Sequence, residues 1–227
     1  MSGGARITER TAANIERNGE DLTREDELIE KLRGRRSRIL DPARDALTAS
    51  IAVPIRARGT GDGLDLLYLL RVQRGGDPWS GHISFPGGKI DASDKGPLET
   101  AIRETREETS LDLSEAECVC RLDDQATHLS KVHVAAFVFF LSNGSELSVS
   151  LNHEIQRAFW IPLADLMDEN RYVTTVVSGE WGKQEVPAID LLGAEEPVLW
   201  GLTYRFTAQI LACIGHRIPG GTEVQIR

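Results

Sequence analysis

SFPGGKIDASDKGPLETAIRETREETSL, residues Ser84 to Leu111, joins a glycine-containing turn to a strongly acidic segment. It begins with a Pro-Gly-Gly turn and continues into a segment that predicts an α-helix. Three acidic residues, Glu104, Glu107 and Glu108, stand at positions i, i+3 and i+4 of that helix. Like charges at this spacing repel one another, so the cluster needs compensating positive charge.

The expected helix also has an apolar side. Gly96 suits the position before the helix and Pro97 suits its first turn. The residues expected to face the core follow i, i+3, i+4, i+7 spacing: Leu98, Ala101, Ile102 and Thr105. The three glutamates then lie beside this stripe, at the border of the core, where uncompensated charge is costly. By helical position, Arg103 and Arg106 compensate that charge only in part.

A hard divalent cation would resolve the charge problem. Mg²⁺ takes oxygen ligands and commonly shares one or two carboxylates with the phosphates of a substrate. Such an ion neutralises a diphosphate and lowers the pKa of an attacking water, while a further carboxylate accepts the proton of that water. Gly87 and Gly88 let the backbone approach the metal or the phosphate closely. Taken alone, the acidic helix would be interpreted as a solvent-exposed helix and the glycine pair as an ordinary turn. Their combination at this spacing is a much more specific signal for a metal and phosphate site.

This combination resembles the box of the Nudix hydrolase family. That box reads Gly, five residues, Glu, seven residues, then Arg-Glu-apolar-x-Glu-Glu-x-Gly-apolar. Gly88 stands first in this chain, and Asp94 occupies the position of the first Glu. The second half is matched by Arg103, Glu104, Glu107, Glu108 and Leu111. The chain departs from the pattern by one extra residue before Arg103, by Thr105 at an apolar position and by Ser110 in place of the Gly.

The resemblance implies a set of site residues. The implied catalytic residues are Glu104, Glu107, Glu108 and Arg103, the last pairing with the carboxylates. The implied ligands of Mg²⁺ or Mn²⁺ are the Gly88 carbonyl, Glu104, Glu107, Glu108 and Glu154. Glu154 occupies the family's later-loop position before the Trp-Ile-Pro-Leu segment, and a solvated loop acid is the alternative. The Glu after the Arg often acts as the base in this family, although that role varies between members.

Within the family, the chain is most similar to the coenzyme A diphosphatase branch, over roughly Ala49 to Ile214. The segment FPGGKIDASD, followed by the extra residue, resembles that branch, as does the Trp-Gly-x-Thr segment near the C-terminus. The branch usually has an Arg-rich pattern before its FPGG segment. Here Trp79 stands in place of a His of that pattern, and Asp77 stands in place of an Arg.

Because the chain departs from the Arg-rich pattern, neighbouring residues are needed to bind the phosphates of the substrate. Arg71 and Arg74 lie nearby and can substitute as substrate-binding residues, since guanidinium groups suit phosphates. Gly87 and Trp79 complete the substrate-binding prediction. Trp79 can stack on a base or line the entrance, and a buried packing role is the alternative.

The rest of the chain is interpreted as a single domain with an extension. We expect a flexible segment over 1–21, a helical extension over 22–48 and the Nudix hydrolase domain over 49–227. The implied fold is α/β, a Nudix α/β/α sandwich with a mixed β-sheet between helices. Strands are expected over 48–57, 64–74, 118–125, 132–142 and 147–152, a hairpin around Gly179, a short helix after Pro162 and a final helix over 200–215.

The extension contains a helix candidate over 23–40 that pairs an apolar stripe with a basic cluster. The stripe consists of Leu28, Ile29 and Leu32. The cluster consists of Arg33, Arg35, Arg36 and Arg38. We interpret the cluster as a solvated face or linker, with a phosphate-binding patch as the alternative.

Composition limits the class of protein. The chain has 227 residues, 41% hydrophobic and 27% charged, which is typical of a soluble globular protein. Its net charge of −9 argues against general binding to nucleic acid or to an anionic membrane. Three cysteines suggest reduced thiols and a cytoplasmic location.

Together these features predict an enzyme that uses Mg²⁺ or Mn²⁺ and water to cleave a nucleoside diphosphate derivative. Coenzyme A or an acyl-CoA is the favoured substrate. ADP-ribose, a dinucleoside polyphosphate and a nucleoside triphosphate are alternatives, and so is a nucleotide-binding Nudix module without catalysis. The partner is therefore a small molecule rather than nucleic acid or membrane, and a homodimer is left open because members of the family often dimerise.

Overall fold

The computed structural model describes residues 24–41, 47–58, 63–75, 79–126, 132–141, 149–179 and 182–221. The predicted flexible segment over 1–21 lies outside this part of the chain, and so does Asp77. None of the helices formed by the described residues is both long enough and apolar enough to cross a membrane.

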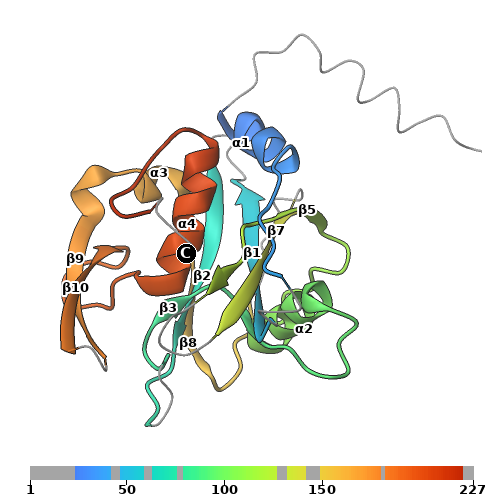
Figure 1. Ribbon diagram of the computed structural model, residues 1–227, viewed down its shortest axis with the longest axis horizontal. Helices are drawn as coiled ribbons and strands as arrows, with labels where there is room; N and C mark the ends of the chain where they lie inside the picture. The colour runs from blue at the N-terminus through green and yellow to red at the C-terminus, as the bar shows by residue number, and fades with distance from the viewer. Residues whose placement is uncertain are drawn as a thin grey trace, which may run out of the picture.

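A mixed sheet of eight strands forms the centre of the described fold (Figure 1). The strands are β1 (Ala49–Ala57), β2 (Leu64–Arg71), β3 (Ile83–Ser84), β4 (Gly87–Lys89), β5 (Glu117–Arg121), β6 (Gln125–Ala126), β7 (His133–Leu141) and β8 (Ile155–Pro162). The main order is β3-β2-β1-β7-β5, with β4 on β1, β6 on β7 and β8 on β2. Strands β1 and β7 are parallel, and the other pairs are antiparallel.

Helices cover both faces of this sheet. The helices are α1 (Arg24–Arg33), α2 (Pro97–Thr109), the single turn α3 (Leu163–Leu166) and α4 (Gly201–Cys213). Side chains of β2 alternate between two apolar clusters, as the period of a strand requires. Leu67 and Leu69 pack in the cluster that contains Ala101 of α2, whereas Leu66 and Tyr68 pack in the cluster that contains α1 and α4. The predicted α/β sandwich with a mixed sheet between helices is confirmed.

Helix α1 packs into the same core as α4. Leu28 and Leu32 are fully buried and Ile29 is nearly so, as the apolar spacing predicted. Arg33 pairs with Glu117 at the start of β5, at 2.8 Å from Arg33 Nη2 to Glu117 Oε2. The helix ends at Arg33, well before residue 40, because Gly34 follows and disfavours continuation.

Three local details differ from the sequence-based expectations. Leu98 is 38% exposed, and the buried face of α2 is formed by Thr100, Ala101, Thr105, Glu108 and Thr109. The described part of segment 147–152 forms no strand, whereas β8 forms from a segment for which no strand was predicted. Strand β8 has a weak alternating pattern because it mixes exposed and half-buried side chains along its length.

The C-terminal third carries a separate hairpin and the last helix. Strands β9 (Tyr172–Gly179) and β10 (Gly182–Ile189) pair in an antiparallel two-stranded sheet, preceded by the short 3₁₀ helix η1 (Glu169–Arg171). This arrangement agrees with the hairpin expected around Gly179. The three cysteines are free thiols.

Candidate active site

The site is built around Gly87 and Gly88 on β4. This strand pairs with the beginning of β1, so that Gly88 lies opposite Ser50 and Gly87 opposite Ile51. A Cβ at Gly87 would lie 2.6 Å from the Ile51 Cα, and the φ angle of Gly87 is +150°. Only glycine therefore fits at Gly87, because the backbones of two paired strands meet there without room for a side chain.

Glu108 lies beneath this glycine pair and is the most buried acid of α2. Its residue exposure is 3%, and its Oε2 accepts a hydrogen bond from the Gly87 N–H at 2.9 Å. Burial raises the pKa of Glu108 to about 8, and the charges of Glu104 and Glu154 act in the same direction. The Gly87 N–H and the positive charge of Arg71 oppose that rise without cancelling it.

Glu104, one helical turn earlier, faces Gly88. A Cβ at Gly88 would lie 2.5 and 2.6 Å from the two carboxylate oxygens of Glu104. The absent side chain of Gly88 is therefore what makes room for this carboxylate. Burial raises the pKa of Glu104 above its ordinary value, although the hydrogen bond from Arg103 opposes the change.

Arg103 holds the acidic side of α2 together. Its Nη1 lies 2.9 Å from Glu104 Oε1 and 3.4 Å from Glu107 Oε2. Its Nε and Nη2 each donate to the Asp94 carboxylate at 2.9 Å. The hydrogen bonds from Arg103 keep the pKa of Asp94 well below its usual range. Arg103 thus pairs directly with Glu104 and Glu107, whereas Glu108 pairs with Arg71, so its compensation of the three glutamates is partial, as helical position suggested.

Asp94 lies on the turn before α2 and links that turn to the helix by hydrogen bonds. Besides Arg103, it accepts a hydrogen bond from the Thr100 hydroxyl at 2.7 Å. Asp94 is one methylene shorter than the Glu of the expected pattern, and one additional residue separates it from Arg103. The bidentate contact forms in spite of both differences.

A second group of charges reaches Glu108 from the ends of β2 and β8. Arg71 Nη1 lies 3.4 Å from Glu108 Oε1, and Arg71 Nη2 lies 3.9 Å from Glu154 Oε2. Arg74 Nη1 lies 3.6 Å from Glu154 Oε1, and Arg74 also donates to the His153 carbonyl at 2.6 Å. The predicted residues Arg71, Arg74, Glu108 and Glu154 are therefore brought together by the fold, although they come from three separate segments.

Trp79 lies on the loop beside these arginines. It is 40% exposed, which argues against the buried packing role. Its neighbour Ser80 accepts a hydrogen bond from the Arg74 N–H, so the loop is attached to the end of β2. His82, on the same loop, contacts the ring of Trp200 edge-on with centroids 4.9 Å apart.

Comparison with known proteins places this site in a family. A family model described as the NUDIX domain matches residues 47–176, which include the glycine pair, α2 and Glu154. The chain belongs to the Nudix family. The Gly88-to-Leu111 pattern is thus a Nudix box, and its Arg-Glu-x-x-Glu-Glu core lies on α2 as the resemblance implied.

Individual relatives extend this similarity. The Nudix chain is 34% identical over 152 residues to the human mitochondrial coenzyme A diphosphatase NUDT8, a match that covers 65% of this chain and 63% of that protein. It is 36% identical over 110 residues to an uncharacterised protein of Schizosaccharomyces pombe, covering 44% of this chain and 33% of the relative. The chain therefore spans less than two thirds of either relative. The similarity to NUDT8 supports the predicted resemblance to the coenzyme A diphosphatase branch.

One solved structure also matches this chain in part. The binary complex of a Caenorhabditis elegans Ap4A hydrolase is 24% identical in sequence, with a TM-score of 0.43, and the match covers 53% of this chain and 83% of that one.

The donor set of this Nudix box suits a hard divalent cation. Glu104 and Glu108 both carry carboxylates at the glycine pair, and the charges of Glu104 and Glu154 both raise the pKa of Glu108. Oxygen donors of this kind match Mg²⁺ or Mn²⁺. In the described part of the chain no group of three or more His, Cys, Asp and Glu side chains is arranged to hold a metal ion as it stands. Guanidinium groups of Arg71 and Arg103 instead provide the positive charge next to these carboxylates.

One residue of the site carried no signal in the sequence. Asn152 precedes β8, and its side-chain oxygen accepts a hydrogen bond from the Glu154 N–H at 2.8 Å. Its own N–H donates to the main-chain oxygen of Glu108 at 3.2 Å. Asn152 therefore joins the Glu154 loop to α2. No local sequence motif predicts this link, because it forms between two segments that are distant in the chain.

Proposed function

We propose that this Nudix protein hydrolyses the diphosphate bond of coenzyme A or an acyl-CoA, with Mg²⁺ or Mn²⁺ as cofactor. The observation that carries the proposal is the position of Glu108, an almost fully buried carboxylate with raised pKa between Gly87 and Arg71. A buried acid in this state costs stability unless a cation compensates it, and function is the usual reason for keeping one. The similarity to human NUDT8 supports the choice of substrate.

In this proposal the metal would be held by Glu104, Glu107, Glu108, Glu154 and the carbonyl of Gly88. A bound Mg²⁺ or Mn²⁺ would neutralise the diphosphate and make water a stronger nucleophile at neutral pH. Arg71 and Arg74 sit at the edge of the carboxylate group, where they can move from Glu108 and Glu154 to substrate phosphate oxygens. We expect Trp79, which is exposed on the adjoining loop, to contact the nucleoside or pantetheine part of the substrate.

The choice of the general base follows from the exposure of the two carboxylates at the glycine pair. Glu104 is more accessible than Glu108, with 19% of its side chain exposed against 5%. We therefore assign Glu104 as the acceptor of the proton from the attacking water, because it is the more accessible of the two carboxylates at the glycine pair. Water oxygen then bonds to phosphorus as the P–O bond of the diphosphate bridge breaks, with the electron pair leaving on the departing phosphate.

A substrate panel tests the proposal. The purified chain is incubated with Mg²⁺ and coenzyme A, acetyl-CoA, ADP-ribose, a dinucleoside polyphosphate or a nucleoside triphosphate, and the products are identified by mass spectrometry. We expect 4′-phosphopantetheine and 3′,5′-ADP from coenzyme A. Faster cleavage of another member of the panel would overturn the substrate, and the absence of any product would favour a binding module without catalysis.

Matched variants connect any activity with the site. Glu108→Gln should reduce turnover by at least about 100-fold, because a metal ligand and its charge are lost. Glu115→Gln removes the same charge from the exposed turn after α2 and should leave turnover unchanged.

The cytoplasmic location is likewise part of the proposal, and fractionation of cells expressing the full protein would test it.

A further inference from the structure

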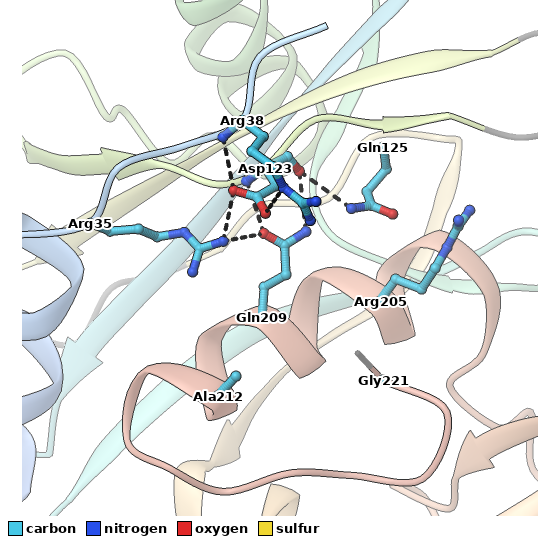
Figure 2. Close-up of a pocket in the computed structure, with 8 residues that line it drawn as sticks. All are labelled: Arg35, Arg38, Asp123, Gln125, Arg205, Gln209, Ala212 and Gly221. Atoms are coloured by element: carbon cyan, nitrogen blue, oxygen red, sulfur yellow. Dashed lines mark hydrogen bonds and ion pairs between the residues drawn. The ribbon is translucent and has the colours of Figure 1, made fainter. Parts of the chain in front are cut away.

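A small cavity lies between α4 and the segment that follows α1, apart from the residues of the Nudix box (Figure 2). Its volume is about 130 Å³. The lining residues are Arg35, Arg38, Asp123, Gln125, Arg205, Gln209, Ala212 and Gly221. Two of these arginines belong to the basic cluster that the sequence analysis interpreted as a solvated face or linker.

Asp123 organises one side of the cavity. Its Oδ1 lies 2.9 Å from Arg35 Nη2, and its Oδ2 accepts from Arg38 Nε at 3.1 Å. Burial opposes its ionisation, but the Arg38 N–H and the charge of Arg35 outweigh that effect and lower the pKa of Asp123. Gln209 of α4 accepts from Arg35 and from the Asp123 N–H and donates to the Asp123 carbonyl, so this side is rigidly held.

The other side of the cavity has positive charge that no described carboxylate pairs with. Arg205 projects from α4, and its only hydrogen bond to a described residue runs from Nη2 to the Ala126 carbonyl at 3.2 Å. No ion pair joins Arg205 to a carboxylate of the described residues. Burial lowers the pKa of this guanidinium, because holding its charge away from water is unfavourable.

Further donors around the cavity have no acceptor among the described residues. The Nε–H of Arg35 is buried without a hydrogen-bond partner. Arg38 uses its main-chain N–H and its Nε for Asp123, which leaves its two terminal nitrogens available. Three guanidinium groups thus line the cavity against the single carboxylate of Asp123, a local excess of two positive charges in a chain whose net charge is −9.

We propose that this cavity binds a phosphate-type oxyanion, either inorganic phosphate or the terminal phosphate monoester of a larger molecule. Arginine N–H groups recognise phosphate oxygens strongly and with defined geometry. The size agrees, because a cavity of roughly 150 Å³ accommodates a molecule as small as benzene, so one phosphate fits and a whole nucleotide does not. The bound oxyanion would join Arg38 of the N-terminal segment to Arg205 of α4.

This site is separate from the Nudix box. The cavity borders α4, whose apolar residues pack with α1 on one face of the sheet, whereas Glu104 and Glu108 belong to α2 on the other face. None of the lining residues is among the proposed metal or substrate ligands. The inference therefore does not depend on the proposed diphosphatase activity.

Phosphate titration of the full chain tests the inference. Isothermal titration calorimetry is run with inorganic phosphate and, separately, with adenosine monophosphate, at constant ionic strength and with EDTA to keep divalent ions away from the acidic site. We expect saturable binding of one phosphate group per chain. Arg205→Gln and Arg38→Gln should each weaken it at least tenfold, since each removes a charged donor. Tighter binding of the nucleotide would identify a phosphate monoester as the ligand, and tighter binding of phosphate the free ion.

The control is a charge-matched variant of the same segment. Arg36 is exposed and does not line the cavity, so Arg36→Gln should bind phosphate like the unaltered protein. Arg38 has 69% of its side chain exposed, which makes Arg38→Gln a variant that should fold even if Arg205→Gln does not. Glu108→Gln should retain phosphate binding. Absence of saturable binding, or equal weakening in Arg36→Gln and Arg38→Gln, would overturn the inference.

Discussion

Glu108→Gln should stabilise the metal-free protein, and more so as the pH rises. Below pH 4.5 the Glu108 carboxyl is protonated in both the folded and the unfolded chain, so its ionisation costs nothing. Above a pH of about 8 it is charged in both states, and the buried charge imposes its full penalty on the folded state. Between these limits the folded chain binds more protons, so the free energy of unfolding falls as the pH rises.

The magnitude follows from the two pKa values. The pKa of Glu108 rises from 4.5 to about 8 on folding. Each tenfold change in proton affinity corresponds to about 1.4 kcal/mol, so the full penalty is on the order of 5 kcal/mol. Glutamine is neutral and keeps an oxygen that can accept the Gly87 N–H. We therefore expect the stability advantage of Glu108→Gln to grow by about 2–5 kcal/mol between pH 5 and pH 8.5.

Urea unfolding followed by tryptophan fluorescence measures this difference. The chain contains four tryptophans, and the buffers contain EDTA. Titrating groups that do not interact with Glu108 affect both proteins alike, so the difference between the two curves reports Glu108 together with its coupling to Glu104 and Glu154. The exposed Glu115→Gln variant should show no growing difference. A constant gap between Glu108→Gln and the unaltered protein across the pH range would refute the argument that Glu108 is buried with a raised pKa.

Substitutions at the two glycines and at the end of α2 give further predictions. Gly88→Ala should lower the melting temperature little, because only the flexible carboxylate of Glu104 must move, but should reduce turnover at least tenfold; unchanged turnover would contradict the placement of Glu104. Gly87→Ala should destabilise by more than about 3 kcal/mol or prevent folding, because a Cβ meets the Ile51 backbone; urea unfolding measures this, and a mild effect would contradict the register of β4 on β1. Ser110 has a φ of +59°, so Ser110→Gly should stabilise by about 0.5–1 kcal/mol, seen as a rise of a few degrees in melting temperature.

Much of the acidic helix could be predicted because its signals are local. Gly96 precedes the first helical residue Pro97, as their chemistry requires, and the three glutamates share α2 as their spacing implied. The position of Ser110 was also informative, because its left-handed conformation is the one a glycine would adopt most easily. The prediction for Leu98 was wrong, since helical spacing gives an apolar stripe but not the angle at which the sheet covers it.

The role of the basic cluster depended on contacts that sequence spacing does not contain. Arg33 pairs with Glu117, Arg36 is exposed, and Arg35 and Arg38 contact Asp123, some 85 residues further along the chain. These four positions look alike in the sequence, because every one is an arginine near the end of a helix. Their different partners arise only when α1 packs against β5 and α4.

Local sequence was enough to predict that three carboxylates share one helix behind a glycine turn, because helical periodicity and glycine's freedom are properties of neighbouring residues. How these charges are compensated depends instead on contacts between segments that are distant in the chain. Pairing of β4 with β1 brings Gly87 over Glu108, and the ends of β2 and β8 bring Arg71 and Glu154 to the same carboxylate. Burial, and with it the raised pKa of Glu108, results from segments that meet in space while lying far apart along the chain.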